Sequence, residues 1–138
     1  MKIVPIFLFS LALLLLNACQ LVTAEPASVA PEQKAQKDRL LALAERMVAY
    51  LPQLPLDSLQ IPRTVENAKM EGTASKSWTS GFFPGVLWQL YDAGRQDALK
   101  EAALSWQSFV EKEKLDSTTH DLGFKLYCSF GQAWRITG

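Results

Sequence analysis

Hydrophobic residues recur at helical spacing in four stretches of the chain, separated by polar residues, glycine and proline. The first stretch ends where Pro52 and Pro55 interrupt it, because proline lacks the amide donor that a helix interior needs. Its apolar residues occupy the i, i+3, i+4, i+7, i+8 and i+11 positions of one helix face: Leu40, Leu43, Ala44, Met47, Val48 and Leu51. We therefore predict a helix with one buried face.

The second and third predicted helices are joined by a short link. The second begins near Ser80, accommodates Pro84 in its first turn and ends at Gly94. Its apolar stripe consists of Phe83, Val86, Leu87, Leu90 and Tyr91. The third runs roughly from Asp97 to Lys114 and carries on one side Leu99, Ala102, Ala103, Trp106, Phe109 and Val110.

A fourth helix is predicted to follow Asp121, and its expected buried face carries Phe124, Tyr127, Phe130 and Trp134. No segment alternates with period two for long enough to predict a strand, so the fold class is all-α. The stretch 52–80 has no helical periodicity. An ordered loop of that length is more often functional than idle, and disorder is the alternative.

The order of the helices places two candidate segments together. Short links make neighbouring helices antiparallel, so the second and fourth helices run in the same direction. Their amino-terminal ends then lie on one rim, which carries Trp78 and the pair His120 and Asp121. A binding or catalytic site needs such convergence of separate segments.

The first residues of the chain form an export signal. Lys2 precedes an apolar run, Ile3–Leu16, that is shorter than the roughly 20 residues a membrane-spanning helix needs. The run continues through Asn17 and Ala18 to Cys19, which resembles the lipobox of bacterial lipoproteins. We expect a signal peptide over residues 1–18 and a lipid on Cys19 as the protein's sole membrane attachment. The alternative is an ordinary signal peptide cut near Ala24.

The lipoprotein resemblance also implies a location. Gln20 follows the cysteine where an aspartate is associated with inner-membrane retention, so the outer membrane is expected in a cell that has one. Residues 19–33 contain Pro26, Pro31 and several small residues, which suits a flexible tether. We expect residues 34–138 to form the amino-terminal part of a larger, truncated domain.

Charge and cysteine content narrow the partners. The chain has 138 residues with 14 basic and 14 acidic side chains, so no basic surplus favours nucleic acid. After Cys19 the sequence holds one more cysteine, Cys128, which excludes a disulfide framework and which we interpret as a small core residue. No metal or cofactor signature is present, since His120 is the only histidine.

Each candidate site residue has a structural alternative when it is taken alone. Asp121 precedes a predicted helix, so it could act only as the amino-terminal cap. His120 could be a hydrogen-bonded structural residue. Trp78 stands at the end of a polar loop, where its ring could stack on a sugar or simply pack beneath the loop.

Together these residues lie in motifs that resemble glycoside hydrolase family 88, the unsaturated glucuronyl hydrolases. The first is Trp78-Thr79-Ser80-Gly81-Phe82-Phe83-Pro84-Gly85, followed by Leu87-Trp88-Gln89-Leu90-Tyr91. The second is Thr119-His120-Asp121-Leu122-Gly123-Phe124, continuing through Tyr127-Cys128-Ser129-Phe130-Gly131, and Ile61-Pro62-Arg63-Thr64 adds a third similarity. The resemblance covers roughly residues 34–138.

The resemblance implies an (α/α)6 barrel, of which this chain supplies about the first four helices. It implies a substrate with a 4,5-unsaturated uronic acid at its non-reducing end, hydrolysed without a cofactor. Asp121 matches one of the family's two pocket aspartates, and Trp78 and His120 are implied to bind substrate. The second aspartate, the principal general acid and base, has no counterpart before Gly138. We therefore expect an amino-terminal fragment that is inactive alone.

Two other functions compete with this one. The chain could be a lipid-anchored helical module that binds glycans or proteins without catalysis. It could also belong to another hydrolase on the same barrel, such as a rhamnogalacturonyl-type enzyme. The Trp-Thr-Ser-Gly-Phe-Phe run that begins at Trp78 favours family 88 over the latter.

Overall fold

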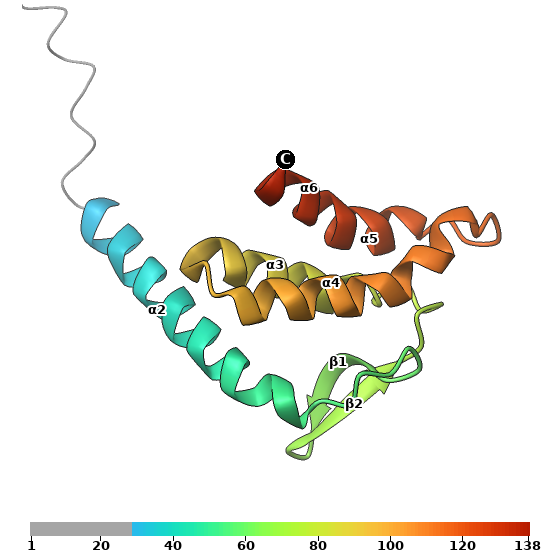
Figure 1. Ribbon diagram of the computed structural model, residues 1–138, viewed down its shortest axis with the longest axis horizontal. Helices are drawn as coiled ribbons and strands as arrows, with labels where there is room; N and C mark the ends of the chain where they lie inside the picture. The colour runs from blue at the N-terminus through green and yellow to red at the C-terminus, as the bar shows by residue number, and fades with distance from the viewer. Residues whose placement is uncertain (1–28) are drawn as a thin grey trace, which may run out of the picture. The chain divides into compact units, whose positions relative to one another are not determined.

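The computed structural model describes residues 29–138, which Figure 1 shows in colour. The expected signal peptide at 1–18, the expected lipid attachment at Cys19 and the tether up to residue 28 lie outside the described residues. Residues Lys37–Gly138 form one compact unit, which contains the predicted site.

Helices dominate the described residues, as the all-α class predicts, and one short hairpin interrupts them. In chain order the elements are α2 (Val29–Tyr50), the 3-10 turn η1 (Leu51–Gln53), β1 (Ile61–Glu66), β2 (Lys69–Thr73), α3 (Phe82–Gly94), α4 (Asp97–Glu111), the 3-10 turn η2 (Lys112–Leu115), α5 (Leu122–Leu126), the π-helical segment η3 (Tyr127–Gly131) and α6 (Gln132–Thr137). Since α2 begins at Val29, residues 29–33 are helical, although the sequence indicates a flexible tether there.

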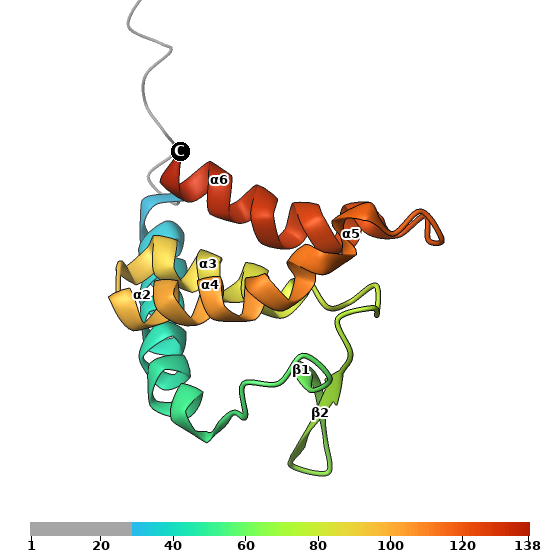
Figure 2. The same cartoon turned by 45° about the vertical axis from the view of Figure 1, so that its right-hand side comes forward.

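Helices α3 and α4 lie side by side and antiparallel, as their short link predicts (Figures 1 and 2). The core between them and their neighbours contains Ala44, Ile61, Leu87, Trp88, Leu90, Leu99, Ala103, Trp106 and Val110. Burying each large aliphatic side chain contributes about 1.5–3 kcal/mol, so this interface holds the unit together. The predicted stripe of α3 is wrong at Val86, which is exposed, while Trp88 is buried.

Strands β1 and β2 form an antiparallel hairpin, so the expectation that the chain has no strand is wrong. The two turn residues, Asn67 and Ala68, both have positive φ, at 49° and 61°, as in a type I′ turn. Alanine rarely occupies that region, so the sequence lacks the Asn-Gly signal that identifies such turns. A register shift between Pro62 and Thr64 also breaks the period-two alternation.

The fourth predicted helix is present as the continuous run α5–η3–α6, and its predicted buried face is right at Phe130, which packs against the core, but wrong at the other three positions. Phe124, Tyr127 and Trp134 are exposed, whereas Lys125 and Ser129 are fully buried. The π-helical turns of η3 lengthen the repeat from i+4 to i+5, which rotates the following residues relative to an ideal helix. The inward face of this run therefore combines apolar side chains that pack against the core, such as Leu126 and Phe130, with the buried polar residues Lys125 and Ser129.

Candidate functional site

Three aromatic rings from two helix starts meet at one rim of the unit. Trp78 lies 5.6 Å from Phe82 and 5.8 Å from Phe124 between ring centroids, and both contacts are edge-on. Phe82 and Phe124 are themselves 6.5 Å apart. Because Phe82 begins α3 and Phe124 lies in α5, these contacts confirm that the two helix starts share a rim. Trp78 remains 48% exposed, so part of its ring is open to a ligand.

Two glycines of the first motif make this convergence possible. A Cβ atom added at Gly81 would lie well under 3.0 Å from the carbonyl oxygen of Lys125, and one at Gly85 would clash with that of Cys128. Real Cβ atoms never approach other atoms so closely, so only glycine fits at either position. The spacing of four residues puts both glycines on one face of α3, where the run α5–η3 packs backbone to backbone.

His120 and Asp121 lie at the start of α5 with different exposures. The side chain of His120 is 95% exposed and that of Asp121 is 28% exposed, with 3.4 Å between Nε2 and Oδ1. The Asp121 backbone amide donates a hydrogen bond to Thr119 Oγ1 at 3.0 Å. The Asp121 carboxylate makes no capping hydrogen bond to the helix it precedes. The cap interpretation is therefore wrong, and the carboxylate is not occupied by the helix start.

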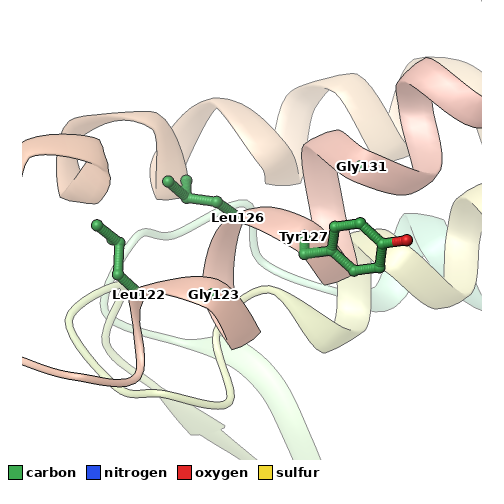
Figure 3. A pocket seen from close by; sticks show the side chains of 5 residues that line it. All are labelled: Leu122, Gly123, Leu126, Tyr127 and Gly131. Atoms are coloured by element: carbon green, nitrogen blue, oxygen red, sulfur yellow. The ribbon is translucent and has the colours of Figure 1, made fainter.

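Two hollows flank the start of this helix. One of about 530 Å³ is lined by His120, Gly123, Phe124, Tyr127 and Cys128. The other, about 450 Å³, is lined by Leu122, Gly123, Leu126, Tyr127 and Gly131, which Figure 3 labels. Of the three predicted ligand-contacting residues, His120 lines the first hollow directly. Trp78 contacts Phe124, which also lines that hollow, and Asp121 contacts His120. The predicted site is thus a shallow, largely aromatic rim.

A buried ionic cluster that the sequence analysis missed lies behind this rim. Lys125 Nζ is 3.7 Å from both Glu113 Oε2 and Asp116 Oδ2, and its side chain is 1% exposed. Glu113 Oε1 also accepts a hydrogen bond from Ser75 Oγ at 2.8 Å. Helical spacing places Lys125 one turn after Asp121, but no local pattern distinguishes a buried lysine from an exposed one.

Cys128 is a free thiol that is partly buried, and burial raises its pKa above the ordinary value of 9.0. It lines the hollow beside His120, so it is less enclosed than the core residue that we expected. Within residues 29–138, no three His, Cys, Asp or Glu side chains converge as metal ligands would. None of the helices in that part of the chain is both long and apolar enough to cross a membrane.

Comparisons with known proteins show that part of this chain is similar to one class of hydrolase. An unsaturated glucuronyl hydrolase of Formosa agariphila is 38% identical over 90 residues, which are 64% of this chain and 22% of that protein. An unsaturated chondroitin disaccharide hydrolase of Streptococcus pneumoniae is 36% identical over 83 residues, 56% of this chain and 20% of that protein. The chain therefore spans about a fifth of the length of these relatives. No protein-family model matches the chain.

A solved structure supports the same relationship. The crystal structure of an unsaturated glucuronyl hydrolase specific for heparin matches with a TM-score of 0.64 and 31% identity, covering 74% of this chain and 28% of that chain. That neighbour is an (α/α)6 barrel, so the all-α fold class is confirmed. The similarities also confirm the resemblance to glycoside hydrolase family 88 over a partial stretch of the chain.

Proposed function

We propose that this chain is the amino-terminal part of a glycoside hydrolase that acts on oligosaccharides ending in a 4,5-unsaturated uronic acid, the products of polysaccharide lyases. The observation that carries the proposal is the convergence of Trp78 with the start of the helix that follows His120 and Asp121. Both motifs resemble the same hydrolase family, and the relatives named above are hydrolases of unsaturated glycans.

The proposed reaction uses the enol ether that this class of substrate contains. A carboxylic acid gives its proton to C4, and the double-bond electrons form the new C4–H bond. Positive charge then develops at C5 and the ring oxygen, and a carboxylate stabilises it. The carboxylate takes a proton from water as the water oxygen attacks C5, and the resulting hemiketal opens and releases the rest of the oligosaccharide.

In this scheme Asp121 supplies a negative charge beside the reacting ring or holds a sugar hydroxyl. Its lack of a capping bond supports either role, because its oxygens are not occupied by the helix start. A second carboxyl group, in barrel residues that this chain does not include, moves the proton. The negative charge of Asp121 would help to keep that second carboxyl group protonated near neutral pH. We therefore propose that residues 1–138 alone do not turn over substrate.

Trp78 and His120 complete the proposed binding site. Trp78 is half exposed yet held by two aromatic neighbours, Phe82 and Phe124, which suits stacking on the apolar side of a sugar ring. His120 lines the adjoining hollow, where its exposed imidazole can contact the sugar or orient the Asp121 carboxylate.

The location of the enzyme is also part of the proposal. The lipobox-like run up to Cys19 supports attachment to the cell envelope by a lipid, on the outer membrane or its periplasmic face in a cell with two membranes. Globomycin-sensitive processing together with radiolabelled palmitate incorporation tests this attachment. If the wild type and a Cys19→Ser control were both cut near Ala24 and neither carried a lipid, the proposed attachment would be contradicted.

The activity is tested with the full-length protein and unsaturated disaccharides. We expect the ultraviolet absorbance of the 4,5 double bond to disappear, and we expect Asp121→Asn to slow that loss by roughly 100-fold or more, as removal of a transition-state charge contact does. Asp92→Asn is the matched control, since Asp92 pairs with Arg95 and Arg135 in exposed ion pairs. Binding without turnover in the wild type would favour the non-catalytic module instead.

A further inference from the structure

The burial of Lys125, behind this rim, is not explained by the chemistry of its side chain. Lys125 is completely buried in α5, although lysine is almost never fully buried unless it is paired. Its two carboxylate neighbours, Glu113 and Asp116, stand 3.7 Å away, which is too long for a hydrogen bond. Among the described residues, Lys125 Nζ is the buried side-chain polar atom without a hydrogen-bond partner. The charge of the Lys125 ammonium group is therefore balanced by electrostatic attraction to Glu113 and Asp116, without a hydrogen bond.

The carboxylates around Lys125 connect it to the segment that carries Trp78. Glu113 receives a hydrogen bond from Ser75 Oγ, at 2.8 Å. The carbonyl oxygen of Ser75 in turn receives one from Ser80 Oγ at 2.7 Å, and both serines are buried. The loop from Ser75 to Ser80 is thus closed on itself and fastened to η2 through Glu113. Trp78 lies inside that loop.

The backbone of Lys125 makes the second connection. Its carbonyl oxygen touches α3 at Gly81, where a Cβ atom would clash with it. The same oxygen accepts a hydrogen bond from Ser129 Oγ at 2.6 Å. Its amide follows the turn that Asp121 opens, with 3.4 Å between Lys125 N and Asp121 O. One residue therefore contacts α3, η2 and the turn that holds Asp121.

We infer that Lys125 is a positioning residue: its buried ammonium group, by attracting Glu113 and Asp116, sets the position of the Trp78 loop relative to Asp121. The role rests on the proposed function, because the spacing between a stacking ring and a carboxylate matters only if both hold one substrate. Lys125 itself does not reach a ligand, since its side chain is 1% exposed and is paired with Glu113 in η2 and with Asp116 directly after η2.

The first test reports the position of Trp78 without relying on activity. The full-length protein is labelled with 5-fluorotryptophan, and the fluorine resonances of Trp78, Trp88 and Trp106 are assigned by single Trp→Phe variants. We expect Lys125→Met to shift the Trp78 resonance and to leave those of Trp88 and Trp106 in place, because both lie in the core between α3 and α4. Lys114→Met is the matched control, since Lys114 lies in η2 next to Glu113 and forms an exposed pair with Glu111.

Either result decides the inference. An unchanged Trp78 resonance in Lys125→Met overturns it, and so does an equal shift of all three resonances, which would mean a general loosening of the fold. If Lys125→Met does not fold, the triple variant Lys125→Met, Glu113→Gln, Asp116→Asn removes all three charges and is judged in the same way. The triple variant removes the attraction without leaving an unpaired buried charge, so the Trp78 resonance should still shift.

The second test separates this inference from the proposed function. With unsaturated disaccharide as substrate, Lys125→Met should lower kcat/KM by roughly 10- to 100-fold, as small displacements of positioned groups do, mostly through a higher KM. Lys114→Met should leave both constants unchanged. A wild type that turns over none of the substrates refutes the proposed function, whatever the fluorine shift. An active wild type with unaltered kinetics in Lys125→Met refutes the positioning role alone.

Discussion

Gly81 and Lys125 meet backbone to backbone, with the Lys125 carbonyl oxygen where a side chain at residue 81 would begin. This contact joins the start of α3 to α5 and brings the loop with Trp78 beside the turn with Asp121. The proposed site therefore depends on a residue with no side chain, and its architecture is sensitive to the smallest substitution.

Gly81→Ala is expected to destabilise the protein by about 1–3 kcal/mol or more, because the added methyl group forces α3 and α5 apart. In urea unfolding the midpoint should fall. Gly123→Ala is the control, since nothing lies within 4 Å of a Cβ there and alanine favours a helix by roughly 0.5–1 kcal/mol over glycine. Equal stability of Gly81→Ala and wild type would disprove the close contact.

Asp121→Ala should change the free energy of unfolding by less than about 0.5 kcal/mol, because its carboxylate caps no helix. A capping aspartate would cost about 0.5–2 kcal/mol on the same substitution. Chemical denaturation of the variant measures the difference. A cost near the upper figure would restore the capping role and weaken the case for Asp121 as a site residue.

Gln107→Leu is expected to cost about 1–3 kcal/mol, because it leaves a buried donor without its acceptor. Trp88 Nε1 donates to Gln107 Oε1 at 2.8 Å inside the α3–α4 interface. Gln89→Leu is the comparison, since Gln89 makes its hydrogen bond to Gln132 at the surface. If both variants unfold at the same urea concentration, the buried bond contributes nothing specific.

The stability that Asp116 contributes should disappear in acid. Hydrogen bonds from the Thr118 side chain and backbone, with a smaller attraction from Lys125, lower the pKa of Asp116 below its ordinary 3.8. A lowered pKa stabilises the fold above the unfolded value and loses that effect as the pH falls through the folded value. The urea midpoints of wild type and Asp116→Asn should therefore differ at about pH 6 and approach each other as the pH falls below 3.8. A constant difference would contradict this.

Trp78→Ala should raise the KM for unsaturated disaccharides by about two- to tenfold in the full-length protein, since an aromatic contact of about 0.5–1.5 kcal/mol is lost. Steady-state kinetics measure the change. Trp134→Ala provides the control, because Trp134 is an exposed tryptophan of α6 away from the rim. An equal effect of both substitutions would remove the specific role of Trp78.

The helical parts of the fold could be predicted from local pattern. The repeat of apolar residues identifies α3 and α4, and the short link at Arg95 makes them antiparallel neighbours. From that order alone the two helix starts with Trp78 and Asp121 fall on one rim, which the contact between Trp78 and Phe124 confirms. The hairpin was missed because its turn places Ala68 at positive φ, where alanine gives no signal.

The sequence by itself determined which residues form the helices and which rim they share, because helical periodicity and link length are local properties. Only the tertiary structure decided that Lys125 is buried and Phe124 exposed. The burial of a lysine depends on carboxylates from other segments, here Glu113 and Asp116, and on a glycine in α3 that admits its backbone. These contacts are made between residues far apart in the chain, so the pattern of residues within one helix does not predict them.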